Sequence, residues 1–230
     1  DEQVTASAQV GTDSYLRGTI DANLPIGETS AIRINLMGSQ GDIPGRNAVD
    51  FDRWGAAIAA GIGIGTDTRV TFSYYHLTAN NMPDYGVPLY TKLGVGAPRT
   101  TASGVLNVPR DSFYGLTASD FQKSEADIAT LITEHDINDA ITFRNVFRYS
   151  KTLNDYLVTN PGDGGAAQFV AGEWWMKRGT KSRWNPTTTV ANVTDFYGKF
   201  TTGGIEHSYD VGLELSRETN RNASYLIYTT

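Results

Sequence analysis

The chain has 230 residues, a formal net charge of −6 at pH 7, 12 Tyr and no Cys. The absence of Cys excludes disulfides, thiolate metal sites and cysteine nucleophiles. The acidic balance argues against a nucleic-acid partner, because proteins that hold a phosphate backbone present a basic face. No apolar run reaches the roughly 20 residues of a membrane helix, whereas membrane strands alternate apolar and polar residues and leave the mean hydropathy unremarkable.

The first half of the chain has a period of two. A weak case at residues 3–10 precedes residues 16–24, in which every even position is apolar or Gly and every odd position is polar. Residues 32–36 and 69–74 repeat this alternation, and residues 53–62 show a weaker form. Because successive side chains of a strand point to opposite faces, each segment predicts a strand with one apolar and one polar face.

The second half continues in the same way, without convincing helical periodicity. Residues 141–149 carry Phe and Tyr in one row and two Arg in the other, and residues 208–215 close the series. Weaker cases at residues 125–136 and 193–201 bring the expected total to about nine strands.

The connections between these segments alternate in length. Short turns with suitable residues follow the strands at 25–29, 63–67, 136–139 and 203–204. The alternate connections are long and cover residues 39–50, 79–123 and 151–192. Such long loops are uncommon in compact domains, but short periplasmic turns and long extracellular loops are typical of outer-membrane barrels.

A soluble β-sandwich also alternates, but its strands usually have about 5–6 residues, fewer than a tilted membrane strand needs. Aromatic residues gather near the expected strand ends, where an aromatic girdle would lie: Tyr15, Tyr74, Tyr75, Phe147, Tyr149, Phe196, Phe200 and Tyr209. We therefore predict an all-β transmembrane antiparallel β-barrel and keep the sandwich as the alternative.

Several segments, in collinear order along essentially the whole chain, resemble segments of one protein family. The most specific is Asn-Met-Pro-Asp-Tyr-Gly-Val-Pro at residues 81–88. It resembles a loop segment of TonB-dependent siderophore receptors, in the branch that takes up catecholate chelates. Residues 10–17 resemble the first barrel hairpin after the plug domain. Further similar segments are residues 33–38, 108–115, 134–136, 144–149, 203–207 and 212–218.

The resemblance implies a plug-filled barrel of about 22 strands, of which residues 1–230 would form the N-terminal part, without the plug and the remaining strands. It also implies a receptor in the bacterial outer membrane that imports ferric siderophores, with the catecholate type preferred. The expected partners are the siderophore, TonB–ExbB–ExbD acting through the plug, and outer-membrane lipid and lipopolysaccharide.

Iron would be cargo inside the siderophore, so no resident cofactor and no catalytic residue are expected. The alternatives are a TonB-dependent receptor for a hydroxamate siderophore or a carbohydrate, a passive porin, or a soluble β-sandwich binding domain.

An anionic, aromatic chelate calls for cationic and aromatic side chains at its entrance. The candidate ligand-binding residues in the expected extracellular loops are Tyr85, Tyr90, Arg110, Tyr114, Trp174, Trp175, Arg178 and Arg183. These residues could instead pack the loops together or contact lipopolysaccharide phosphates, and residues 83–86 could simply shape a turn.

The polar rows suggest a second set, which would form salt bridges inside the barrel and with the plug: Arg17, Asp21, Arg33, Arg69, Arg144 and Arg148. The three His residues, at positions 76, 135 and 207, fall on separate strands without metal-ligand spacing, so no metal site is expected.

Overall fold

The computed structural model describes residues 2–88, 108–162 and 168–226, which form strands, turns and connections without a helix. The strands are β1 Gln3–Val10, β2 Leu16–Pro25, β3 Ser30–Asp42, β4 Asp50–Ile62, β5 Thr68–Asn81, β6 Phe121–Asn138, β7 Ile141–Pro161, β8 Gln168–Val170, β9 Glu173–Trp175, β10 Arg178–Thr202 and β11 Ile205–Asn220. Among the described residues, no helix is long and apolar enough to cross a membrane.

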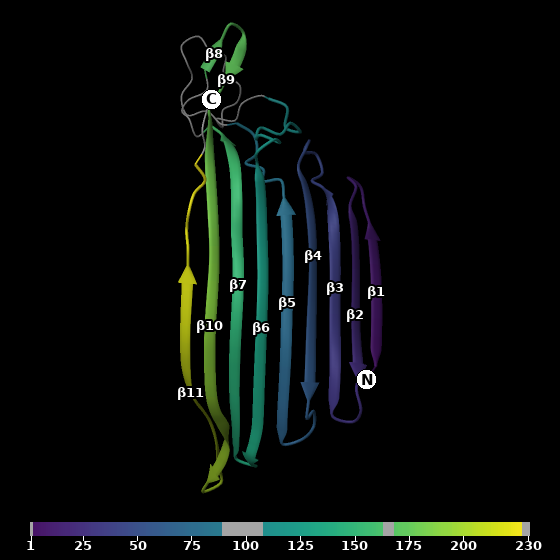
Figure 1. Ribbon diagram of the computed structural model, residues 1–230, viewed down its shortest axis with the longest axis vertical. Helices are drawn as coiled ribbons and strands as arrows, with labels where there is room; N and C mark the ends of the chain where they lie inside the picture. The colour runs from purple at the N-terminus through teal and green to yellow at the C-terminus, as the bar shows by residue number, and fades with distance from the viewer. Residues whose placement is uncertain (1, 89–107, 163–167, 227–230) are drawn as a thin grey trace.

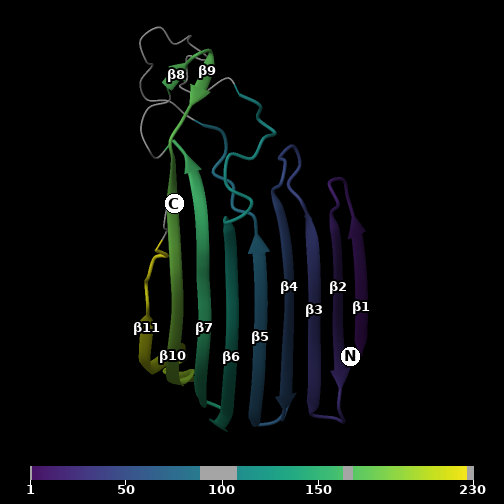
Figure 2. The same ribbon diagram turned by 45° about the horizontal axis from the view of Figure 1, so that its top comes forward.

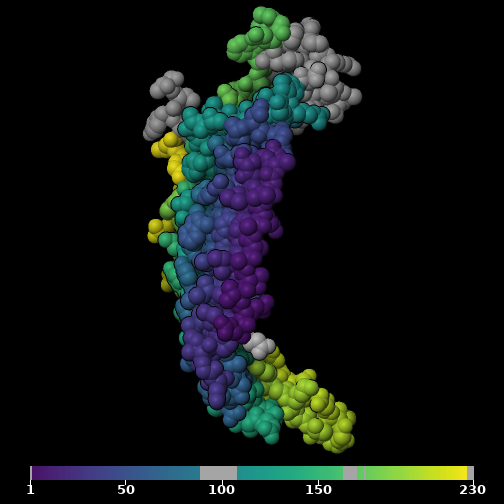
Figure 3. All heavy atoms as spheres, turned by 90° about the vertical axis from the view of Figure 1, so that its right-hand side faces the viewer, coloured from purple at the N-terminus to yellow at the C-terminus, as the bar shows by residue number. Residues whose placement is uncertain are grey.

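Nine strands form one antiparallel sheet in the order β1-β2-β3-β4-β5-β6-β7-β10-β11, and β8 and β9 form a separate two-stranded sheet. Figure 1 shows the large sheet as an up-and-down meander, with β1 and β11 at opposite edges. In the side view of Figure 3 the sheet has a narrow, bowed profile. This arrangement agrees with the predicted segment of an antiparallel barrel wall.

The two ends of the sheet differ as the sequence predicted. Short turns at residues 26–29, 63–67, 139–140 and 203–204 join the strands at one end, called the turn end. The described residues of the connections that follow β3, β5 and β7 (43–49, 82–88, 108–120, 162 and 168–177) lie at the other, called the loop end, where Figures 1 and 2 place the β8–β9 hairpin. Gly203 and Gly204 have φ of 57° and 83°, the left-handed backbone that a two-residue hairpin turn requires.

The strand register separates the side chains into two faces. One face, called the polar face, carries the charged residues that the alternation assigned to one row: Arg17, Asp21, Arg33, Arg69, Arg144, Arg148, Asp195, Lys199, Asp210 and Glu214. The other, called the apolar face, carries large apolar residues that stay exposed: Leu16, Ile20, Leu36, Ile58, Phe72, Leu131, Phe147, Phe196, Val211, Leu213 and Leu215.

The apolar face has no protein partner among the described residues. The buried hydrophobic residues of the described ranges are Val49 and Val158, both toward the loop end, while Val211 is 67% exposed. A sandwich needs a second sheet packed about 10 Å from this face, and the described strands provide only the small β8–β9 sheet. The soluble-sandwich alternative is therefore wrong.

The apolar face forms a belt across the strands. In β7 its row runs from Ile141 to Tyr149, with the polar residue Asn145 within it, before Lys151 interrupts it. The row is about 26 Å long along the strand at roughly 3.3 Å per residue, or about 20 Å along the membrane normal for a strand tilted by about 40°. In β11 the row ends at Leu215, before Arg217. Outer-membrane barrels carry an apolar band about 25 Å tall, and the β7 row covers most of that height.

All three predicted long connections were too long. The stretch expected to be irregular at 151–192 contains the end of β7 and the beginning of β10, the stretch expected at 79–123 contains the end of β5 and the beginning of β6, and the stretch expected at 39–50 contains the end of β3 and the first residue of β4. Arg178 and Arg183 therefore lie in β10 and not in a loop. Beyond the apolar belt both faces of these strands are hydrated, so the alternation that marks a membrane strand is lost there.

Candidate ligand-binding site

The connection between β5 and β6 is anchored to the sheet through Asp120, which is 4% exposed. Its carboxylate accepts hydrogen bonds from the Thr159 amide and hydroxyl, both at 2.8 Å, and from the Leu116 amide at 3.0 Å. Thr159 belongs to β7 and is itself buried. A buried carboxylate needs such donors, and these donors hold residues 116–120 against the end of β7.

A second anchor comes from the connection between β3 and β4. Arg46 donates to Asp84 through two nitrogens, with Nε–Oδ2 at 2.6 Å and Nη2–Oδ1 at 2.8 Å. The Arg46 and Asp84 side chains are 14% and 20% exposed. Arg46 also donates to the Arg110 carbonyl oxygen, and the Asn47 amide donates to the Asp111 carbonyl oxygen at 2.6 Å. The two connections are thus joined at several points.

Asp84 also shapes the segment at residues 81–88, whose sequence most resembles a loop of the catecholate receptors. Its Oδ1 accepts a hydrogen bond from the Gly86 amide at 2.8 Å, and Gly86 has a φ of 77°. This side-chain-to-backbone bond forms a turn of the kind that Asp favours. Residues 83–86 therefore form the turn that was the alternative prediction for them, with Tyr85 at its centre.

Tyr85 projects from this turn with 51% of its surface exposed. The Lys181 ammonium of β10 lies 6.0 Å from the centroid of its ring, at the outer limit of a cation–π contact. Arg183 lies two residues farther along β10, so Lys181 and Arg183 project from the same side of the strand. Tyr85, Lys181 and Arg183 form what we call the rim cluster, in which the Tyr85 ring lies beside one cation, Lys181, and the second cation, Arg183, follows on the same side of β10.

The other sequence candidates make different contacts, as far as the described residues show. Tyr114 donates to the Pro109 carbonyl oxygen at 2.6 Å, and Arg178 donates to the Gly115 carbonyl oxygen at 3.0 Å, so both brace the 108–120 segment. The Arg110 side chain is exposed. Trp175, 62% exposed, and the backbone of Trp174 belong to β9. Tyr90 lies outside the described residues.

The segment after β11, at residues 221–226, packs against β10, β7 and β6 near the loop end. Ala223 forms a bridge with Trp184 of β10, and the Tyr225 hydroxyl donates to Asp155 of β7 at 2.8 Å. The Tyr225 ring also makes an edge contact with Phe121, with centroids 5.9 Å apart. The Asp155 carboxylate raises the pKa of the Tyr225 phenol above 10.0, because the bond to a carboxylate favours the protonated form.

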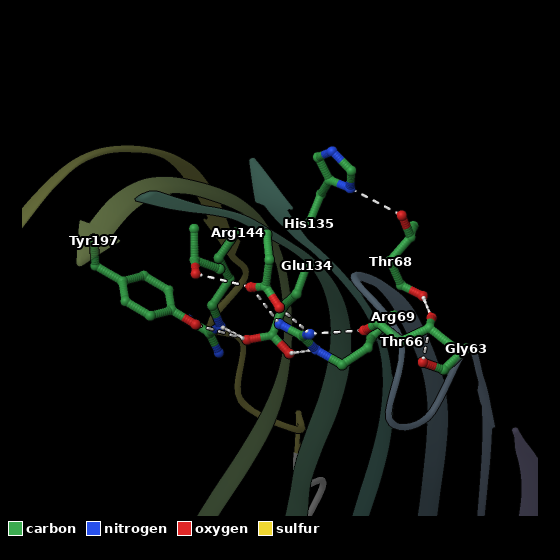
Figure 4. Close-up of polar contacts among 10 residues, drawn as sticks. Gly63, Thr66, Thr68, Arg69, Glu134, His135, Arg144 and Tyr197 are labelled. Atoms are coloured by element: carbon green, nitrogen blue, oxygen red, sulfur yellow. Dashed lines mark hydrogen bonds and ion pairs between the residues drawn. The ribbon is translucent and has the colours of Figure 1, made fainter. Parts of the chain in front are cut away.

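The polar face carries an ionic network near the turn end, which we call the wall network (Figure 4). Arg69 of β5 donates two hydrogen bonds to the Asp136 carboxylate, from Nη1 at 2.6 Å and from Nη2 at 2.9 Å. Arg144 of β7 lies 3.6 Å from Glu134 and 3.5 Å from Asp195, so the network continues to β10. Its other contacts are Arg69–Glu134 at 3.7 Å, Tyr197 to Glu134 at 3.3 Å and Thr142 to Asp136 at 2.8 Å.

The predicted set on the polar face falls into separate groups. Arg69 and Arg144 enter the wall network, while Arg33 and Asp21 form their own two-bond pair, at 2.9 and 2.6 Å. Arg17 and Arg148 share the face with them. The prediction missed the network partners Glu134, Asp136 and Tyr197, although all three occupy the polar row of their strands.

The described residues contain no group of three or more His, Asp and Glu side chains that could hold a metal ion. All three His side chains are hydrogen-bonded within the sheet: His76 Nδ1 lies 2.7 Å from Asp127, His135 Nδ1 lies 2.9 Å from Thr68 and His207 Nε2 lies 2.7 Å from Thr202.

The chain is similar to known siderophore receptors. It is 37% identical to the catecholate siderophore receptor Fiu of Escherichia coli K12, over 96% of this chain and 30% of that protein. It is 34% identical to the probable TonB-dependent siderophore receptor PiuA of Acinetobacter baumannii, over 96% of this chain and 29% of the relative. No family model matches the chain.

A solved structure agrees with these relatives. The ferric-catecholate import receptor Fiu from E. coli K12, in its open form, matches with a TM-score of 0.85 and 35% identity, over 96% of this chain and 35% of that chain. The chain thus spans about 30% of the length of the curated relatives it matches. Those relatives are outer-membrane receptors with a β-barrel fold. The chain is a homologue of the barrel of TonB-dependent siderophore receptors and is located in the outer membrane.

Proposed function

We propose that residues 1–230 form part of the barrel of a TonB-dependent receptor that imports ferric siderophores, with the catecholate type preferred. The observation that carries this proposal is the rim cluster, where the Tyr85 ring stands beside the Lys181 ammonium. The relatives support it, because Fiu is named a catecholate siderophore receptor and PiuA a probable siderophore receptor.

The chemistry of the rim cluster fits such a ligand. Catecholate oxygens bound to Fe³⁺ carry negative charge, so an ammonium and a guanidinium attract them. The exposed Tyr85 ring offers an aromatic surface for the catechol rings. A hydroxamate chelate lacks these rings and a neutral carbohydrate lacks the charge, which is why the catecholate is preferred. Transport makes or breaks no covalent bond here, and iron enters as cargo within the chelate.

The two faces of the sheet suggest the remaining partners. The polar face, with its wall network, would line the barrel interior and meet an N-terminal plug, through which TonB–ExbB–ExbD would act. The apolar face would meet lipid, and the polar residues that follow it toward the loop end, such as Lys151 and Arg217, would lie at the level of lipopolysaccharide headgroups.

Equilibrium binding to the full-length receptor tests the ligand. Ferric catecholate should bind more tightly than a ferric hydroxamate, and Tyr85→Ala and Lys181→Gln should each weaken the catecholate about tenfold, the size expected for one cation–π or charged contact. Lys151→Gln removes a charge from the apolar side and should have no effect. Equal affinity for both chelates, or a porin-like conductance without saturable binding, would contradict the proposal.

A further inference from the structure

The rim cluster depends on a residue that does not belong to it. We infer that Arg46, in the connection between β3 and β4, positions Tyr85 for the ligand by holding the carboxylate of Asp84. This inference rests on the proposed function, because it assigns Tyr85 a role in ligand binding. It makes the two connections a single recognition unit, although Arg46 and Tyr85 are far apart in sequence.

The first step is the geometry of the Arg46–Asp84 pair. Two parallel bonds of 2.6 and 2.8 Å form the planar fork that guanidinium makes with a carboxylate. Both side chains are mostly shielded, at 14% and 20% exposure, so solvent screens the pair less than it screens a surface ion pair. Lys in place of Arg46 would keep the charge but lose the fork.

The second step leads from Asp84 to Tyr85. One carboxylate oxygen, Oδ1, accepts bonds from both Arg46 Nη2 and the Gly86 amide. Tyr85 stands between these two bonded residues, and Gly86 takes a left-handed backbone with φ of 77°. The direction of the Tyr85 side chain therefore depends on the turn that this oxygen closes, and the turn depends on where Arg46 holds the oxygen.

Arg46 does not contact the ligand directly in this proposal. Its guanidinium already donates to Asp84 and to the Arg110 carbonyl oxygen, and little of its side chain is open to solvent. Tyr85 has half of its surface exposed and faces Lys181. Loss of Arg46 should thus act on binding through the order of Tyr85 and not through loss of a positive charge at the ligand.

The test uses the full-length receptor and two readouts. The first is the Kd of the ferric complex of catechol in Tyr85→Ala, Arg46→Gln, Arg46→Lys, Asp84→Asn and the double variant Arg46→Gln/Asp84→Asn. The second is the mobility of a nitroxide attached through the substitution Tyr85→Cys. Arg217→Gln is the control, because it removes an arginine from the apolar side of β11.

We expect Arg46→Gln and Asp84→Asn each to raise the Kd about tenfold, with the double variant no worse than either, because they break one interaction. Arg46→Lys should lie between them and the parent, and Arg46→Gln should free the nitroxide. An unchanged Kd in both Arg46 variants, with Tyr85→Ala weakened, would overturn the inference but not the proposed function. An unchanged Kd in Tyr85→Ala would overturn the ligand role of Tyr85 and the inference with it.

Discussion

The Tyr209 hydroxyl of β11 donates a hydrogen bond of 2.9 Å to the main-chain carbonyl of Ala140, in the turn between β6 and β7. The bond passes over Gly198 of β10, which pairs with Tyr209. A Cβ at Gly198 would collide with the Ala140 carbonyl oxygen and would lie 3.1 Å from the Tyr209 hydroxyl. Gly198 thus allows one side chain to tie β11 to a turn beyond β10.

Substitution of Gly198 should loosen this tie. Gly198→Ala should destabilise the folded barrel by about 1–3 kcal/mol, the usual cost of overpacking a filled site, and Tyr209→Phe by about 1 kcal/mol for one hydrogen bond. Denaturant unfolding in detergent measures both. Gly38→Ala in β3 is the matched control, because a Cβ there meets no atom within 4 Å. Equal stabilities of the Gly198→Ala and Gly38→Ala variants would show that the tie has no energetic role.

The wall network should couple Arg69 and Asp136 more strongly than an exposed pair. A double-mutant cycle with Arg69→Gln and Asp136→Asn should give a measurable coupling energy, since two hydrogen bonds join the side chains. The Lys199–Glu206 pair, with both side chains about two-thirds exposed, is the control and should show no measurable coupling. Similar coupling in the two cycles would mean that the network is an ordinary set of surface charges.

Asp120 should control the order of the rim. Asp120→Ala leaves the Thr159 and Leu116 amides without their acceptor, at a cost of about 1–3 kcal/mol for each buried donor. We expect faster proteolysis within residues 108–120 while the sheet stays intact, because the strands do not depend on this carboxylate. Asp111→Ala, at an exposed position, is the control. Unchanged cleavage in Asp120→Ala would contradict the anchoring role.

The bond between Tyr225 and Asp155 should be visible in a pH titration. The pKa of Tyr225 is raised, so its contribution to folding is complete below the ordinary value of 10.0 and is lost as pH rises through the higher folded value. Ultraviolet titration of tyrosinate should show a late-titrating phenol that moves to lower pH in Asp155→Asn. If Asp155→Asn leaves the titration unchanged, the segment after β11 is not held by this bond.

The alternation of residue types predicted the two faces because the bilayer imposes it. Arg33, Arg69 and Arg144 share a face in the structure as the rows implied. The beginning of β10 at Arg178 could not be predicted in this way, since both faces are hydrated beyond the belt and the period of two disappears.

For the rim cluster, the sequence predicted suitable residue types but not their contacts. The sequence identified Tyr85 and Arg183 as suitable residues, but the contact of Tyr85 with Lys181 and the support from Arg46 depend on tertiary folding. Arg46 and Asp84 are 38 residues apart, and no local pattern links two such loop positions. Arg46 and Asp84 meet only because the folded strands bring the two loops together.

We propose that this chain belongs to a TonB-dependent importer of ferric catecholates. Uptake of radiolabelled iron tests this proposal most directly. Cells that lack their other siderophore receptors would carry the full-length receptor, with and without TonB. We expect saturable uptake from ferric catecholate that requires both the receptor and TonB, and that falls in Tyr85→Ala but not in Arg217→Gln. Uptake that persists without TonB, or uptake from a ferric hydroxamate in place of the catecholate, would contradict it.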